Sequence, residues 1–353
     1  MKASVIIPTK NGEEYLEECL TAVFNQKTAF TFEVIIVDSG SRDRTLEIIE
    51  KFQKKIHPIP PLKKEGDSSL LQREVRRDLI GLSDFKIYQI PPQEFGHGRT
   101  RNFAVSKTQG EYLVFLTQDA TPADENWLAN IIKPIEQDSE IAGVFGKHLP
   151  RKDCDPFQRR ALNDFMNSFG AKTAIYQLSQ EGRKEEEYEK NKHVLSFFSN
   201  VNSAIRRSVF EKIPFQEVEM GEDQFWAKDI ILAGHKKAYE PQAAVYHSHN
   251  YGIWNQFKRW FDEFRQHKKN QNYVGVSGVW KIPFLALRLW FNDIKYIRSQ
   301  SEYNLWQKIY WSIWIFFMDL ARFCAEYLGG RYDKLPIWLQ NRLSMQYEII
   351  HKR

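Results

Sequence analysis

Two adjacent carboxylates, Glu222 and Asp223, form the pattern with the most direct chemical use in this sequence. A carboxylate in a closed pocket can serve as a general base that takes the proton of an attacking hydroxyl group. Acidic residues are also favoured in the first turn of a helix, so the pair has a purely structural interpretation as well. Adjacent helical residues point about 100° apart, so only one of the two can face a given hydroxyl group.

Single carboxylates follow two apolar runs that are typical of strands. Asp38 comes after residues 32–37, and Asp119 closes Thr117-Gln118-Asp119 after residues 111–116. Asp38 can accept a hydrogen bond from a nucleobase or a ribose, although aspartate is also a common helix cap. Asp119 can help to hold Mg²⁺ or Mn²⁺, which neutralises a diphosphate so that it can leave, although a lone aspartate is often a turn residue.

A glycine-rich segment carries cations at the start of an expected helix. Two glycines flank His97, and Arg101 and Asn102 follow within the same eight residues, 95–102. Glycine lets the backbone approach a ligand closely, and a helix N-terminus with arginine suits a phosphate. A loop with surface arginines explains the segment without a ligand.

Two histidines, His247 and His249, lie one residue apart after another strand-like run. In a strand both rings point to the same side, where one of them could complete the ligand shell of a metal ion. Single histidines are more often packed or surface residues, and the spacing only moderately favours a ligand role.

Strands and helices must position these residues. Apolar runs alternate with stretches that repeat apolar residues at helical spacing, in the order 4–7, 15–24, 32–37, 46–52 and 111–116. This alternation predicts βαβ units and a mainly parallel sheet, which binds ligands at the carboxyl ends of its strands. Two charged stretches, 58–83 and 180–192, are expected to be surface insertions.

The composition limits the classes of function. Lys and Arg exceed Asp and Glu by 50 to 45, and a net charge of +5 is too small to indicate a nucleic-acid partner. Cys19, Cys154 and Cys324 are far apart and odd in number, which favours a reducing compartment such as the cytoplasm over a disulfide framework or a zinc site. No apolar run reaches the roughly 18 residues of a membrane span.

The character of the chain changes near residue 250. Eight of the ten tryptophans follow, and residues 251–300 hold nine Lys or Arg against three Asp or Glu. The aromatic residues between 254 and 264 share one helical face, with cations around it. A basic aromatic face suits a membrane surface, and a helical subdomain that packs its aromatics on the catalytic domain is the alternative. We therefore expect a domain of residues 1–250 and a helical region of residues 251–353.

In their order along the chain, several segments resemble the family 2 glycosyltransferases with the GT-A fold. The matching segments are residues 6–12 (Ile-Ile-Pro-Thr-Lys-Asn-Gly), 37–41, 117–119 and 222–223. Residues 95–102, 115–122 and 246–251 are similar to the bacterial rhamnosyltransferase branch of that family. The resemblance covers roughly residues 1–250. It implies an α/β, GT-A-like domain.

The resemblance also implies roles for single residues. Thr9 and Asp38 would hold the nucleotide base and ribose, and Arg101 would lie near the donor phosphates. The remaining residues expected in the nucleotide-sugar site are His97, Asn102 and Gln118. Asp119 would be the carboxylate that binds the metal ion, with His247 or His249 as a further ligand. Asp223 would be the general base, with Glu222 as an orienting carboxylate.

The activity that the resemblance implies is inverting glycosyl transfer. L-Rhamnose from dTDP-L-rhamnose would pass to a lipid-linked surface saccharide at the cytoplasmic face of the membrane. A hexosyltransferase that uses a UDP-sugar is one alternative, and a non-catalytic nucleotide-binding scaffold is another. Thr117 favours the scaffold, because it replaces the first carboxylate of the usual Asp-x-Asp metal motif, whereas Asp38, Asp119 and Asp223 favour the enzyme.

Overall fold

The computed structural model describes residues 1–56, 81–179, 184–271 and 273–351. Most of the expected insertion at residues 58–83, and residues 180–183 of the other, lie outside these described residues. The chain divides into two compact units. The first comprises residues 1–151 and 162–247, and the second comprises residues 152–161 and 248–353.

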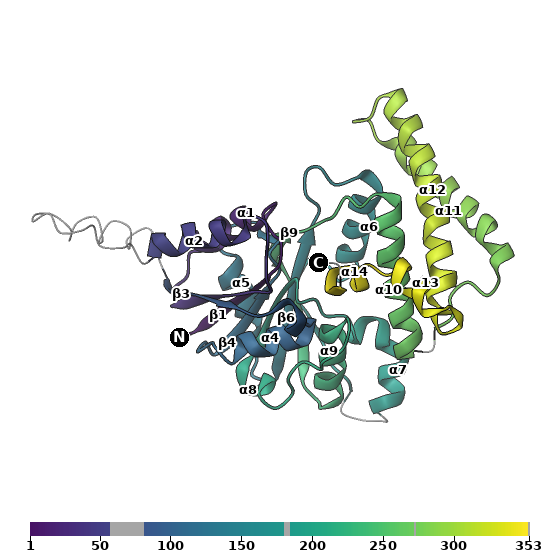
Figure 1. Ribbon diagram of the computed structural model, residues 1–353. Coiled ribbons are helices and arrows are strands. Elements are labelled where there is room, and N and C mark those ends of the chain that lie inside the picture. Colours follow the sequence, from purple (N-terminus) through teal and green to yellow (C-terminus); the bar gives the residue numbers. More distant parts are fainter. Residues whose placement is uncertain (57–80, 180–183, 272, 352–353) are drawn as a thin grey trace, which may run out of the picture. The chain divides into compact units, whose positions relative to one another are not determined.

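One mixed sheet forms the centre of the first unit (Figure 1). Its strand order is β3-β2-β1-β4-β8-β6-β9-β5, and β7 pairs with β9. The strands are β1 (Ala3–Thr9), β2 (Phe32–Asp38), β3 (Leu82–Gln89), β4 (Tyr112–Leu116), β5 (Thr121–Pro122), β6 (Ile141–Leu149), β7 (Ala174–Tyr176), β8 (Asn202–Arg206) and β9 (Lys236–Tyr246).

Strand β1 explains the layered packing of this unit. Val5 and Ile7 pack on one face of the sheet, Ile6 packs on the other, and all three are fully buried. Strands buried on both faces read as continuous apolar runs, which is the pattern in the sequence. Helices therefore cover both faces of the sheet, and the expected α/β class is confirmed.

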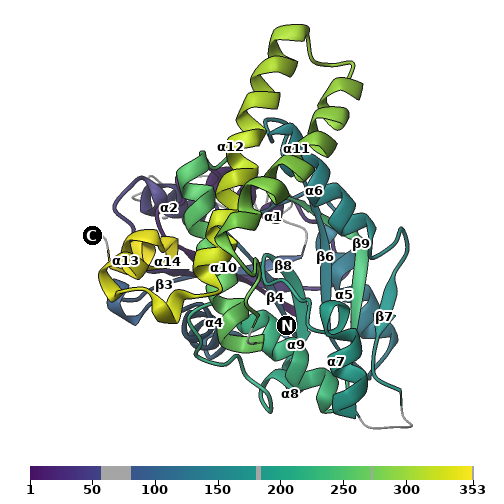
Figure 2. The same ribbon diagram turned by 90° about the vertical axis from the view of Figure 1, so that its right-hand side faces the viewer.

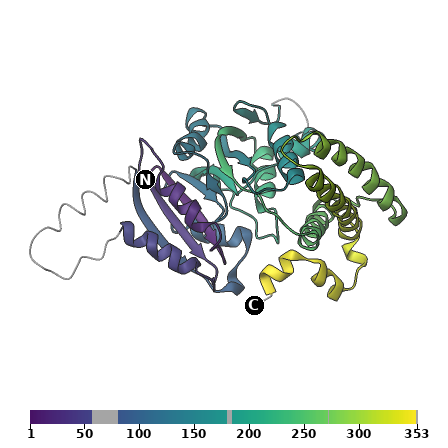
Figure 3. The ribbon, with the colours of Figure 1, turned by 90° about the horizontal axis from the view of Figure 1, so that it is seen from above.

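The helices divide between the two faces. One face packs against α1 (Leu16–Phe24), α2 (Thr45–Ile56) and α5 (Trp127–Gln137). The other packs against α4 (His97–Val105), α7 (Lys184–Leu195), α8 (Arg207–Phe210) and α9 (Glu222–Leu232). In Figure 3, the purple helices α1 and α2 lie side by side over the first strands.

The expected parallel arrangement holds for β3, β2, β1 and β4 and ends at β8. Strand β8 runs antiparallel to both of its neighbours, β4 and β6. An apolar run predicts that a segment is a buried strand, but it does not specify the direction of that strand. The antiparallel pairs of β8 could therefore not be predicted from the sequence pattern.

The second unit is helical. Its helices are α10 (Ile253–Gln271), α11 (Ile282–Ser299), α12 (Leu305–Gly329), α13 (Ile337–Leu343), α14 (Met345–His351) and the first part of α6 (Pro156–Asn167). Helices α11 and α12 lie side by side (Figure 2). Within the described ranges, none of the helices has both the length and the apolar character needed to cross a membrane.

The aromatic face of α10 lies largely in the interior of the second unit. Phe257 and Phe261 are buried in an apolar cluster with Ala325 of α12 and Leu343 of α13. Lys258, expected beside a membrane, is buried and paired with Glu348 of α14. These residues of α10 therefore belong to the interior of the second unit, and a membrane contact of the region 251–353 stays a prediction. They pack within their own unit, because α12 and α13 offer them apolar partners.

Candidate active site

The predicted site residues of the first unit gather where parallel strands end. Thr9 is the last residue of β1, and Asp38, the last residue of β2, lies opposite it in the strand register. Asp119 follows the end of β4, which pairs with β1 on its other side. The sheet thus brings these three side chains to the same edge, as the strand pattern predicts for Asp38 and Asp119.

Local donors hold the carboxylate of Asp38. Its Oδ2 accepts hydrogen bonds from the backbone N–H groups of Gly40 and Ser41, both at 3.0 Å. Its Oδ1 accepts from the Thr9 hydroxyl group at 3.2 Å and from the Ser41 hydroxyl group. These bonds fix the turn after β2, but Asp38 does not cap a helix, because α2 begins only at Thr45. A role of Thr9 and Asp38 in nucleotide binding stays a prediction.

Gln118 clamps the loop that follows β1. Its Oε1 accepts from the backbone N–H of Lys10 at 2.9 Å, and its Nε2 donates to the Lys10 carbonyl oxygen at 3.0 Å. Gly12 makes room for this amide, because a Cβ atom at position 12 would lie 2.4 Å from Gln118 Oε1. The predicted nucleotide contact of Gln118 therefore competes with two bonds that the side chain already makes to the protein.

Asp119 and His247 form the candidate metal centre of the first unit. Strand pairing of Thr121 with Tyr246 brings them together, and Asp119 Oδ2 lies 3.6 Å from His247 Nε2. This distance is too long for a hydrogen bond. Two ligands with bonds of about 2.1 Å to one ion lie roughly 3–4 Å apart, so the pair fits a shared Mg²⁺ or Mn²⁺. His249 lies two residues after His247 in the sequence and belongs to the second unit. Its role as a metal ligand stays a prediction.

Two residues without a signal in the sequence, Arg151 and His148, lie beside this centre. Arg151 donates to the backbone oxygen of Asp119 at 2.9 Å and to the Glu18 carboxylate at 2.9 Å, and its guanidinium group covers the Tyr15 ring. His148 of β6 lies beside His247, with 5.7 Å between ring centroids. Burial, and then the proximity of His247, lower the pKa of His148 to about 3, so it is neutral. No local motif marks either residue.

Helix α9 presents the carboxylate pair. The helix begins at Glu222 after Gly221, whose φ of 83° favours glycine. Asp223 Oδ2 accepts from the backbone N–H of Asn200 at 3.0 Å. Glu222 Oε1 accepts from Arg101 Nη1 at 3.0 Å and from the Asn200 amide at 3.1 Å. One buried asparagine therefore holds both carboxylates, and the sequence offered no signal for it.

The two carboxylates differ in their electrostatics. Burial, and then the charge of Glu222, raise the pKa of Asp223 to about 7. Burial also opposes the ionisation of Glu222, but the Arg101 guanidinium and then His97 hold its pKa below the usual value. Neighbouring carboxyl groups with opposite pKa shifts are typical of acid–base pairs in enzymes. Asp223 is thus suited to exchange a proton near neutral pH, and Glu222 to remain charged.

The glycine-rich segment, residues 95–102, contributes a cation that contacts the carboxylate pair. Arg101 is buried between Glu222 and the His97 carbonyl oxygen, to which it donates at 3.1 Å. The Asn102 amide donates to the Phe215 carbonyl oxygen at 2.9 Å, so α4 is joined to the chain before α9. The predicted roles of His97, Arg101 and Asn102 at the donor phosphates remain predictions, and the contacts of Arg101 and Asn102 are made with the protein.

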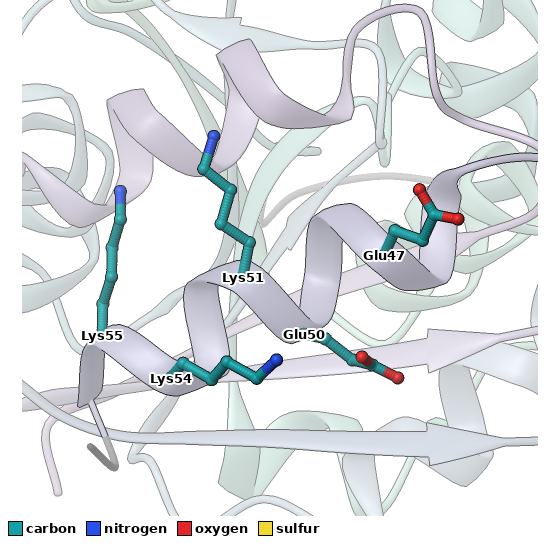
Figure 4. Close-up of a pocket in the computed structure, with 5 residues that line it drawn as sticks. All are labelled: Glu47, Glu50, Lys51, Lys54 and Lys55. Carbon is teal, nitrogen blue, oxygen red and sulfur yellow. The ribbon is translucent and has the colours of Figure 1, made fainter. Parts of the chain in front are cut away.

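A surface hollow elsewhere in the first unit does not belong to this site. It measures about 540 Å³, and Figure 4 shows that charged side chains of helix α2 line it. Its lining residues are Glu47, Glu50, Lys51, Lys54 and Lys55. None of the predicted site residues is among them, and one helix surface with mixed charges offers no convergent group for chemistry.

The sequence matches known glycosyltransferases. The family model described as Glycosyl transferase family 2 matches residues 4–214. The O-antigen chain rhamnosyltransferase RfbN of Salmonella typhimurium is 30% identical over 352 residues, which cover 98% of this chain and 95% of the relative. The O-antigen chain rhamnosyltransferase WbaN of Salmonella anatum is 29% identical over 97% of this chain and 93% of the relative.

Two solved structures share the fold. TarS of S. aureus, residues 1–349, has a TM-score of 0.50 and 17% identity, with 95% of this chain and 91% of that chain covered. PcManGT, a mannosyltransferase of Pyrobaculum calidifontis solved with GDP-Man and Mn²⁺, has a TM-score of 0.51 and 17% identity over 95% of this chain and 88% of that one. The expected GT-A-like fold is therefore confirmed.

Proposed function

Because the chain belongs to glycosyl transferase family 2, we propose that it transfers L-rhamnose from dTDP-L-rhamnose to a hydroxyl group of a lipid-linked surface saccharide. The observation that carries this proposal is the nearly full-length similarity to two O-antigen chain rhamnosyltransferases. The GT-A-like fold and the carboxylates at its strand ends support an enzyme rather than a scaffold.

Asp223 is the general base of the proposed reaction. Its pKa of about 7 lets it lose its proton at neutral pH and accept the proton of the acceptor hydroxyl group. The acceptor oxygen forms a bond to the anomeric carbon while the bond from that carbon to the diphosphate oxygen breaks. A single displacement of this kind inverts the anomeric configuration, and dTDP leaves with the electron pair.

Glu222 and Arg101 are positioning residues in this mechanism. Their ion pair, at 3.0 Å, keeps the Glu222 carboxylate charged and fixed in position next to Asp223. The backbone N–H of Asn200 holds Oδ2 of Asp223, and the backbone N–H of Gln224 donates to Oδ1, so the carboxylate has a defined orientation. Thr9 and Asp38 are assigned to the base and ribose of the donor.

Asp119 and His247, with His249 as a further ligand, would hold Mg²⁺ or Mn²⁺, which supplies positive charge to the leaving diphosphate. Arg151 keeps the Asp119 backbone in place through its hydrogen bond to the carbonyl oxygen. Lys10 lies in the loop that Gln118 clamps beside this edge of the sheet.

A panel of nucleotide sugars tests the donor. The full chain is incubated with dTDP-L-rhamnose, UDP-glucose, UDP-N-acetylglucosamine or GDP-mannose, and release of the nucleoside diphosphate is measured with Mg²⁺ or Mn²⁺. We expect release from dTDP-L-rhamnose at the highest kcat/KM. Preference for a UDP-sugar would support the hexosyltransferase, and the absence of release from every donor, with and without saccharide acceptors, would support the scaffold.

A further inference from the structure

The helix pair α11 and α12 of the second unit exposes an unusually large apolar surface. On α11 the exposed residues include Phe284, Leu287 and Phe291, and on α12 they include Trp306, Tyr310 and Ile313. Phe284 is 68% exposed and Trp306 is 78% exposed. Scattered exposed apolar residues need no explanation, but large ones that repeat along one side of a helix mark an interaction surface. We call these six residues the hairpin face.

Helical periodicity makes each half of the hairpin face a stripe. Phe284, Leu287 and Phe291 are spaced by three and four residues, and so are Trp306, Tyr310 and Ile313, which keeps each set on one side of its helix. Inside the pair, Trp290 donates from its indole nitrogen to the Ser312 carbonyl oxygen at 2.7 Å. Trp290 therefore faces α12, whereas its sequence neighbour Phe291 points about 100° away around the axis of α11 and is exposed.

The charges on α11 indicate the partner. Arg288, Lys295 and Arg298 are exposed and lie within about 40° of Phe284 around the helix axis, because each residue advances by about 100°. The carboxylate of α11, Asp293, is buried and paired with Arg160 of α6. The α11 part of the hairpin face thus lies beside three exposed cations. A membrane interface with anionic lipids takes up both aromatic side chains and cations.

We propose that the hairpin face docks on an anionic lipid surface. The aromatic side chains enter the headgroup region, and the three cations of α11 contact lipid phosphates. A second copy of the chain is a poorer occupant, because a two-fold interface would place the cations of one copy near those of the other. The proposal is independent of the assigned donor and base, since none of its residues belongs to that site.

Vesicle flotation tests the proposal with the full chain. At low salt, vesicles of phosphatidylglycerol and phosphatidylcholine should carry the protein, and vesicles of phosphatidylcholine alone should carry much less. The double variant Phe284→Ser with Trp306→Ser should lower the partition coefficient by at least about tenfold. The triple variant Arg288→Gln, Lys295→Gln, Arg298→Gln should lower it by about fivefold per charge removed and weaken its salt dependence.

Trp338→Ser provides the matched control. Trp338 is 65% exposed on α13, outside the hairpin face, so its loss should leave flotation unchanged. Thermal unfolding of every variant verifies that the fold is intact, which we expect because the changed side chains are exposed.

Three results would overturn the proposal. The first is failure of the wild type to float with anionic vesicles. The second is a loss of flotation in the control as large as in the double variant, or no loss in the double variant. The third is a dimer in sedimentation equilibrium that the double variant converts to a monomer, which would assign the hairpin face to a second copy.

Discussion

At the scale of single residues, the chemistry depends on the different surroundings of two adjacent carboxylates at the start of α9. Glu222 forms an ion pair with Arg101 and accepts a hydrogen bond from the Asn200 amide, whereas Asp223 accepts hydrogen bonds from backbone N–H groups. The Arg101 guanidinium and His97 keep Glu222 ionised against its burial, whereas burial and then the charge of Glu222 let Asp223 bind a proton near neutral pH. The identity of the base therefore follows from the surroundings and not from the residue type.

Substitution of each carboxylate tests this assignment. Asp223→Asn keeps the shape of the side chain but removes the proton acceptor, so kcat should fall by about 10²–10⁴-fold. The Kd of the donor should change little, because other residues hold the nucleotide. Turnover and donor binding are measured for this variant and for Glu222→Gln. A dead Glu222→Gln enzyme beside a normal Asp223→Asn enzyme would place the base at the other position.

The pH profile gives a second test at this scale. Asp223 must be deprotonated to act, and its pKa is raised to about 7, so kcat should rise with pH and reach half its maximum near pH 7. Glu222→Gln removes a negative neighbour that raises this pKa, so the rise should shift to lower pH. An unshifted profile in Glu222→Gln would show that Glu222 does not act on Asp223 through its charge.

Loss of Asp119 tests the metal centre. Asp119→Ala removes the carboxylate that faces His247, and we expect turnover to be nearly abolished. Metal binding is measured directly by titration of Mn²⁺ into wild type and variant. Full turnover in excess EDTA would contradict the proposed role of the ion, whatever the result for the variant.

At the scale of elements, the site depends on contact between α4 and the chain before α9. Gly98 lies against the Gln216 carbonyl oxygen, and an added Cβ atom would approach that oxygen to 2.3 Å. The Asn102 amide bonds the neighbouring Phe215. This close packing positions Arg101 next to Glu222. Gly98 is therefore needed for the packing of α4, in addition to any role in ligand binding.

Gly98→Ala tests this contact. The added methyl group meets backbone atoms, which cannot move aside as a flexible side chain can, so the variant should lose about 1–3 kcal/mol of unfolding free energy. Its kcat should also fall, because Arg101 moves with α4. Gly96→Ala is the matched control: its nearest neighbour, Arg99 Cβ, lies 3.4 Å away, and its φ of −164° suits any residue. Equal stability of the two variants would contradict the packing argument.

At the scale of the whole molecule, each unit has its own apolar interior and its own buried charges. Asp319 of the second unit is buried, and burial, then Asp293, raise its pKa to about 8, while Arg322 and Arg160 oppose the rise. Asp319 is therefore protonated in the fold at neutral pH. The unfolded chain loses this proton near pH 4, so this group makes the fold less stable as pH rises from about 4 to 8.

Asp319→Asn removes this titration. Thermal unfolding of the wild type should become easier between pH 5 and 9, and the variant should show a flatter dependence. At pH 9 the variant should be more stable by at least about 1 kcal/mol, because the wild type then buries a charge with one unsatisfied oxygen. Asp333→Asn, an exposed change in the same unit, is the control. Parallel curves for wild type and Asp319→Asn would refute the argument.

The sequence was sufficient for the parts of the fold that local patterns determine. Apolar runs followed by Asp38 and Asp119 predicted parallel strands with their ends at one edge, since each signal lies within a few residues. Asn200 and Arg151 escaped prediction because their partners lie 22 or more positions away and polar side chains in loops carry no periodic signal. Likewise, the aromatic stripe of α10 could not reveal whether other helices would bury it.

The clamp between Gly12 and Gln118 has a consequence for how this protein can evolve. A side chain at position 12 would occupy the space of the Gln118 amide, and a different residue at position 118 would leave the Lys10 backbone groups without their partner. Neither position can therefore be substituted without a change at the other. Among homologues, positions 12 and 118 should therefore show linked substitutions, with glycine retained wherever glutamine is retained and both replaced together in lineages that have rebuilt this loop.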